Sequence, residues 1–168
     1  LKFFDVPQTV QSAVRALSKH GAAFATIHGN DSIMAAAAKD KGNMKVLAVT
    51  MLTSLDEGDV RDLGFQVDVK DIVLSRAKRA LQLGCDGVIS SGLEVSELRR
   101  HLGDNFIVVT PGIRPVKNTD DQKRTVDVEE AFQNGADYIV VGRPIKEHAN
   151  PKQAAADIQQ RIRKIFSS

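Results

Sequence analysis

The sequence predicts an α/β fold built on a parallel β-sheet. Five apolar segments are rich in Val and Ile and lack polar alternation, which is typical of strands buried on both faces. Amphipathic helical stretches lie between them. Three of the segments share one pattern, in which a glycine that ends a helix is followed by a short turn and then by a buried strand. The glycines are Gly21, Gly84 and Gly135. Repeated βα units of this kind build either a doubly wound sheet or a closed barrel.

The strand segments cover residues 22–28, 45–50, 87–91, 106–110 and 138–142. Ahead of them, Lys2-Phe3-Phe4-Asp5 reads as the end of a further strand that enters a loop. A closed barrel needs eight strands. If this chain belongs to a barrel, about two to three βα units are missing from it, on the N-terminal side. No linker divides the 168 residues, and we expect a single partial domain over residues 1–168.

Helices are predicted at Pro7–His20, Asp68–Leu83, Asp127–Asn134 and Pro151–Phe166, where apolar residues recur at helical spacing. Glycine follows the first three of them, as expected just past a helix end. The segment Ser54-Leu55-Asp56-Glu57 fits a capping box, which would start a further helix.

Composition excludes several classes of protein. The net charge is only +2, with acids and bases interspersed, whereas a nucleic-acid surface would show clustered Lys and Arg. The longest apolar runs are about seven residues, far short of the ~20 needed to cross a bilayer. Cys85 is the single cysteine, which fits a reducing cytoplasm. His20, His101 and His148 do not have metal-ligand spacing.

Two loops place a glycine beside an arginine. If segments 106–110 and 138–142 are the last two strands of a barrel, the loops after them contain Gly112 with Arg114, and Gly142 with Arg143. Phosphate often binds after strands 7 and 8 of such barrels. Glycine lets the backbone approach an anion, and arginine offers a fork of donors to phosphate oxygens. Two such pairs at successive strand ends predict a phosphate site.

Lys2 and Asp5 lie three residues apart where a strand ends. A lysine held near carboxylates stays protonated, and it can stabilise a developing carbanion and then protonate it. The pair could equally be solvated at the end of the chain.

These residues carry a family resemblance. Leu1-Lys2-Phe3-Phe4-Asp5-Val6-Pro7 resembles the Asp-x-Lys-x-x-Asp signature of the orotidine 5'-phosphate decarboxylase family, whose first Asp would stand immediately before Leu1. Segments 51–54, 110–115, 121–124 and 141–144 resemble further blocks of the bacterial form, in the family's order and spacing. The similarity spans essentially the whole chain.

The resemblance implies a (β/α)8 TIM barrel lacking its first strands, with the end of strand 3 to strand 8 present. It implies decarboxylation of orotidine 5'-monophosphate to uridine 5'-monophosphate in de novo pyrimidine synthesis, without metal or other cofactor. It also implies a cytoplasmic homodimer with shared active sites. Two members of the family's Lys-Asp-Lys-Asp network would lie before Leu1, so we expect the chain alone to be inactive.

The resemblance further implies roles for single residues. Lys2 would be the catalytic lysine. Asp5 would be a second catalytic residue of the same charged network, but it would reach into the active site of the other subunit. Thr9 would accompany it and hydrogen-bond the ribose there. Thr53 and Pro111 would line the pyrimidine pocket. The 5'-phosphate would be held by Arg114, Gln122, Gly142 and Arg143.

Three other interpretations remain open. A related decarboxylase that acts on a keto-sugar phosphate with Mg²⁺ would share the Lys2–Asp5 element. A non-catalytic phosphoribosyl-binding module would bind through Arg143 without turnover. The chain could also be a stable structural fragment whose open edge at Lys2–Phe4 needs a covering partner.

Overall fold

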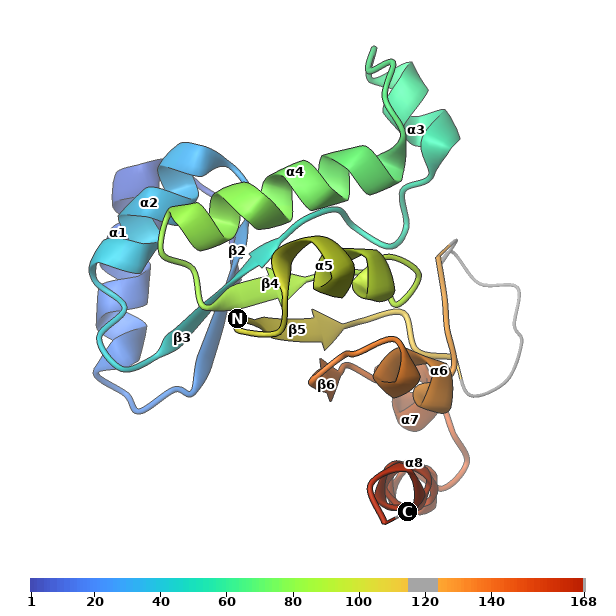
Figure 1. Ribbon diagram of the computed structural model, residues 1–168. Coiled ribbons are helices and arrows are strands. Elements are labelled where there is room, and N and C mark those ends of the chain that lie inside the picture. The colour runs from blue at the N-terminus through green and yellow to red at the C-terminus, as the bar shows by residue number, and fades with distance from the viewer. Residues whose placement is uncertain (115–123, 168) are drawn as a thin grey trace.

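A parallel sheet forms the centre of the chain. The structure, a computed structural model, describes residues 1–114 and 124–167. Its six strands pair in the order β1-β2-β3-β4-β5-β6 (Figure 1). This sequential order excludes a doubly wound sheet, in which the strand order reverses at a switch point. The strands are β1 (Lys2–Phe3), β2 (Phe24–His28), β3 (Lys45–Val49), β4 (Gly87–Ile89), β5 (Ile107–Thr110) and β6 (Tyr138–Ile139).

The sheet is strongly curved. The rings of Phe24 on β2 and Tyr138 on β6 lie 5.3 Å apart, although three strands separate them in the sheet. Within the described ranges no ladder pairs β6 with β1, so the sheet is open between these two strands. The six strands have the sequential parallel order and the curvature of a (β/α)8 barrel, which confirms the predicted fold class.

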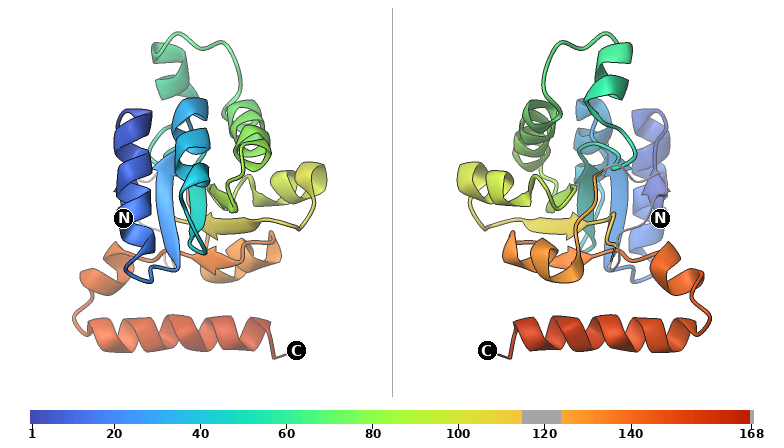
Figure 2. Two further views of the ribbon diagram at one scale, coloured as in Figure 1. Left: turned by 90° about the vertical axis from the view of Figure 1, so that its left-hand side faces the viewer. Right: turned by 90° about the vertical axis from the view of Figure 1, so that its right-hand side faces the viewer.

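Helices cover the outside of the curve. Figure 2 shows α1, α2, α4 and α5 in an arc around the strands, with α8 along the far side next to α7. The small helix α3 projects beyond the C-terminal end of the sheet, to which the strand arrows in Figure 1 point. The helices are α1 (Pro7–Ser18), α2 (Asp31–Lys39), α3 (Glu57–Asp62), α4 (Val69–Gln82), α5 (Val95–Leu102), α6 (Val128–Gln133), α7 (Arg143–Lys146) and α8 (Pro151–Ile165).

Two groups of buried apolar side chains make the core. The larger lies between the strands and the arc of helices, and includes Val14, Ile27 and Met34, each with no exposed surface or almost none. The smaller joins α6 and α8 to the segment after β5 through Val128, Ile158 and Ile113. Helix α1 buries Val10 and Val14 at helical spacing, and α8 buries Ala154 and Ile158.

The predicted elements are found with shifted ends. Strands predicted at 87–91 and 138–142 form ladders over only Gly87–Ile89 and Tyr138–Ile139, because the chain then turns into loops. A short helix was expected at residues 35–38, where α2 lies, but the helices α5 and α7 were not predicted. No described helix combines the length and the hydropathy that a bilayer crossing requires.

The predicted capping box was wrong by two residues. The side chain of Asp56 accepts the backbone N–H of Asp59, and the side chain of Asp59 accepts that of Asp56. Helix α3 therefore starts at Glu57, and Ser54 lies before it. The Glu57 carboxylate accepts the N–H of Val69 instead, at 2.9 Å, and so joins α3 to the start of α4.

Candidate active site

Most of the predicted site residues line one cavity at the C-terminal ends of the strands. The cavity has a volume of about 430 Å³. It is lined from β1, from the loops after β3 and β5, and from the segment after β6. The predicted residues on its wall are Lys2, Thr53, Pro111, Arg114, Gly142 and Arg143.

Lys2 reaches this cavity from the short edge strand β1. It is opposite Thr26 of β2, another residue of the cavity wall. Thr26 holds the preceding peptide twice, because its backbone N–H and its hydroxyl both donate to the carbonyl of Leu1, at 3.0 and 2.9 Å. The backbone before Lys2 is thereby fixed, while the lysine itself is exposed at the cavity mouth.

The loop after β5 brings Arg114 to the cavity. Gly112 has φ +76°, and a Cβ there would meet the carbonyl oxygen of Arg124 at 3.0 Å. The turn therefore requires glycine because of its positive φ and the nearby carbonyl of Arg124. This reason differs from the one we expected, which was that glycine would let an anion approach the backbone. Beyond the turn, the N–H of Arg114 donates to Val126 at 3.0 Å, which fixes the backbone from which this guanidinium extends.

The segment after β6 brings the second glycine–arginine pair. Gly142 is the N-cap residue of α7, with Pro144 in the first turn. Among the described residues nothing lies within 4 Å of the Cβ position at Gly142, so this part of the chain leaves open space in front of the Gly142 backbone. The two pairs come from different strand ends and line the same cavity, as the phosphate-site prediction requires.

Asp5 and Thr9 lie apart from this cavity. Asp5 is exposed and its carboxylate accepts the N–H of Val6 at 2.6 Å. Thr9 is on the exposed side of α1. Neither belongs to the cavity wall. Gln122 lies outside the described residues.

A histidine stands next to the catalytic lysine candidate. The ring of His28, at the end of β2, stacks on Phe4 with 3.9 Å between centroids. Burial lowers the pKa of His28, and the positive charges of Lys2 and Arg76 lower it further. The imidazole is therefore favoured in its neutral form beside Lys2. From the sequence, His28 could not be distinguished from an ordinary structural histidine.

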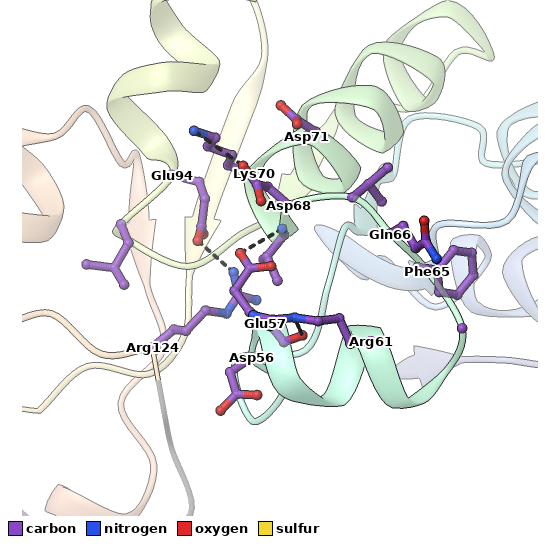
Figure 3. A pocket seen from close by; sticks show the side chains of 14 residues that line it. Asp56, Glu57, Arg61, Phe65, Gln66, Asp68, Lys70, Asp71, Glu94 and Arg124 are labelled. Carbon is purple, nitrogen blue, oxygen red and sulfur yellow. Dashed lines mark hydrogen bonds and ion pairs between the residues drawn. The ribbon is translucent and has the colours of Figure 1, made fainter.

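A buried ion pair behind the cavity was not predicted. Arg124 Nη1 lies 2.6 Å from Glu94 Oε1, and the two side chains are only 9% and 10% exposed. Figure 3 shows the pair at the edge of a neighbouring open cavity, which is also lined by residues of α3 and α4. Burial raises the pKa of Glu94, and the charge and hydrogen bond of Arg124 oppose that rise. Arg124 entered the sequence analysis only as the last residue of a motif block, because 30 residues separate the partners.

Comparisons with known proteins agree with this geometry. The model of the orotidine 5'-phosphate decarboxylase / HUMPS family matches residues 1–158. An orotidine 5'-phosphate decarboxylase of Methylococcus capsulatus is 63% identical over 170 residues, covering 100% of this chain and 70% of the relative. That of Nitrobacter winogradskyi is 48% identical, covering 94% of this chain and 67% of the relative.

Solved structures give the same result. The crystal structure of orotidine 5'-phosphate decarboxylase from Lactobacillus acidophilus has a TM-score of 0.81 at 36% identity, covering 100% of this chain and 74% of that one. The enzyme from Pyrococcus horikoshii has a TM-score of 0.70 at 27% identity, with 97% and 72% covered. The family match, the sequence identities and the shared fold together establish that this chain belongs to the orotidine 5'-phosphate decarboxylase / HUMPS family.

Proposed function

We propose that this chain forms the catalytic part of an enzyme that decarboxylates orotidine 5'-monophosphate to uridine 5'-monophosphate in pyrimidine synthesis. The observation that carries the proposal is the single cavity of about 430 Å³ lined by Lys2, Arg114 and Arg143. It places an ammonium group and two guanidinium groups around a space that would hold a nucleotide. The relatives named as orotidine 5'-phosphate decarboxylases support the reaction.

The proposed chemistry is electrostatic. When carbon dioxide leaves, the electron pair of the broken bond stays on pyrimidine C6. The ammonium group of Lys2 stabilises that charge and then transfers a proton to C6, which gives the product. Fixed charges favour such a transition state because they are oriented before the reaction begins.

Binding groups away from C6 orient the substrate. Arg114 and Arg143 would hold the 5'-phosphate with the backbone at Gly142, and Gln122, which lies outside the described residues, would join them. Thr53, only 7% exposed, and Pro111 would contact the pyrimidine. Energy from phosphate binding can then be used to position the base beside Lys2.

Asp5 and Thr9 would act in the site of a second subunit. Their positions away from their own chain's cavity support this role, since neither lines it. The proposed enzyme is thus a cytoplasmic homodimer whose two sites share residues.

Two alternatives make different predictions. A Mg²⁺-dependent keto-sugar-phosphate decarboxylase is less well supported, because the two glycine–arginine pairs line one cavity and the relatives are named for the nucleotide reaction. Turnover of orotidine 5'-monophosphate that resists a chelator would exclude it. A non-catalytic phosphoribosyl-binding module would bind the nucleotide and never turn it over.

Replacing Lys2 tests the proposal directly. In the full-length enzyme, Lys2→Ala should lower kcat by about 10³-fold or more, because it removes both the stabilising charge and the proton donor. Binding of uridine 5'-monophosphate, followed by calorimetry, should remain measurable. Lys152→Ala, on the exposed surface of α8, is the matched control and should keep full activity. More than a few per cent of wild-type turnover in Lys2→Ala would refute the assignment.

A further inference from the structure

We propose that the buried ion pair of Glu94 and Arg124 positions the two loops that form the walls of the substrate cavity. The proposal rests on the proposed function and deepens it, since it adds a positioning device to the same site. Arg124 does not line the cavity of Lys2, Arg114 and Arg143, so it would act through the residues that do.

Arg124 holds the loop after β3 by two hydrogen bonds. Its Nη2 donates to the carbonyl of Leu52 at 3.1 Å, and its backbone N–H donates to the carbonyl of Thr53 at 3.3 Å. Leu52 and Thr53 both line the substrate cavity. One residue therefore fixes two consecutive peptides of the proposed pyrimidine side.

The same segment holds the loop after β5. The carbonyl of Arg124 packs against Gly112, where a Cβ would be 3.0 Å away. Two residues further on, Val126 forms a bridge with Ile113 and accepts the N–H of Arg114 at 3.0 Å. Displacement of Arg124 would therefore move the backbone that carries Arg114, on the proposed phosphate side.

Glu94 connects this arrangement to β4. It is the N-cap residue of α5, in the connection from β4, and its carboxylate binds Arg124 Nη1 at 2.6 Å. Ser91 of the same connection donates its hydroxyl to the Arg124 carbonyl at 3.3 Å. The connections after β3, β4 and β5 thus all contact Arg124, and Figure 3 shows its ion pair with Glu94.

Stability alone does not explain this choice of residues. Burying two charges costs desolvation energy, and a well-packed apolar pair of similar volume is often equally stable or more so. An apolar pair cannot donate to the Leu52 carbonyl. The planar guanidinium can serve a carboxylate and a carbonyl at once, because its donors point in fixed directions.

Arg99 provides a matched control. Its side chain is 13% exposed and pairs with Asp137 at 2.8 Å. It also donates to the carbonyls of Gly135 and Phe106, at 3.0 and 2.8 Å. These partners precede β5 and β6, so they lie at the end of the strands opposite to the cavity. Arg99 and Arg124 make similar contacts and differ in which end of the sheet they hold.

The experiment compares activity with stability in the full-length enzyme. The double variant Glu94→Leu/Arg124→Met removes both charges and should unfold within a few degrees of the wild type. Its KM for orotidine 5'-monophosphate should still rise at least about tenfold. Arg99→Met should lose stability and change KM less than about twofold. A double variant that folds and has the wild-type KM and kcat would overturn the proposal.

A second variant covers the case in which the double variant does not fold. Arg124→Lys keeps a positive charge beside Glu94 but loses the fork that reaches Leu52. It should fold and show a raised KM, and a wild-type KM would again overturn the proposal. Wild-type enzyme in the same assay tests the proposed function separately from the positioning role of Glu94 and Arg124. If the proposed function is wrong, the wild-type enzyme will show no turnover either.

Discussion

At the scale of single residues, the proposed phosphate site depends on two arginines. Arg114 and Arg143 come from the connections after different strands and meet at one cavity. Charged hydrogen bonds to a phosphate are worth more than neutral ones, about 1.5–3 kcal/mol each. An anionic group between them therefore gains more than a neutral sugar or base would.

Arg143→Ala should weaken phosphate-bearing ligands selectively. We expect the Kd of uridine 5'-monophosphate to rise about 10–100-fold, which corresponds to the loss of one charged hydrogen bond. The Kd of uridine should change less than about twofold. Calorimetric titration of both ligands into the full-length enzyme measures the difference, with Arg163→Ala on the exposed side of α8 as control. Equal losses for both ligands would count against a phosphate role.

The glycine–arginine pairs could be predicted from the sequence because each is a local pattern after a recognisable strand. The structure brings both pairs to one cavity with Lys2, as expected. The pair of Glu94 and Arg124 could not be predicted in this way. Its partners follow different strands, and only the folded sheet brings the two connections together.

At the scale of elements, the start of β4 is tied to β3 by one carboxylate. Asp86 accepts the N–H of Val46 at 2.9 Å and the Nζ groups of Lys41 and Lys45 at 2.6 and 3.3 Å. Its own N–H donates back to Val46 at 2.9 Å. Burial acts to raise the pKa of Asp86, but hydrogen bonds from Lys41, Val46 and Lys45 outweigh it, and the pKa is lowered.

The lowered pKa of Asp86 makes its contribution depend on pH. A carboxyl group with a lowered pKa in the folded state stabilises the protein above its unfolded-state pKa, and that stability is lost as the pH falls through the folded-state pKa. Asp86→Asn should lower the free energy of unfolding by about 1.5–3 kcal/mol at pH 7. The difference from wild type should shrink when the pH falls below ~4.

Urea denaturation of the full-length enzyme at pH 7 and at pH 3 measures this effect. Asp68→Asn is the control, because the exposed side chain of Asp68 pairs with Lys70 at 3.7 Å and, among the described residues, makes no cap bond to α4. Its effect should stay below about 1 kcal/mol at either pH. A loss in Asp86→Asn that is the same at both pH values would show that the ionised carboxylate is not the cause.

Element types were easier to predict than element ends. Helix periodicity identified α1, α4 and α8 because each buries one apolar side. The short helix α7 has four residues, too few for any periodic signal. At α3 the sequence predicted a capping box that begins at Ser54, whereas the reciprocal bonds of Asp56 and Asp59 place it two residues later.

At the scale of the whole molecule, the sequential order of the strands was the feature that patterns alone left open. Alternating βα units fit both a doubly wound sheet and a barrel, because hydrophobic periodicity does not record which strands are neighbours. The curvature that brings Phe24 near Tyr138 is likewise a long-range property. It gathers the strand ends around one cavity, and Asp5 and Thr9 remain outside it.

The position of Asp5 leads to a prediction about the assembled enzyme. If Lys2 acts in its own chain's cavity and Asp5 in the partner's, Lys2→Ala and Asp5→Ala subunits should each be inactive when alone. In a mixed dimer, one active site contains both substitutions, and the other contains both native residues, Lys2 and Asp5. With free exchange about half of the dimers are mixed, so about a quarter of the wild-type activity should return.

Mixing Lys2→Ala with Lys2→Met subunits is the control, because every site then lacks the lysine and no activity should return. Native mass spectrometry would establish that the subunits exchange, and turnover of orotidine 5'-monophosphate would be followed in the same samples. If mixed dimers form and activity does not return, Asp5 acts within its own chain. Its exposed position and its bond to the N–H of Val6 would then need a different explanation.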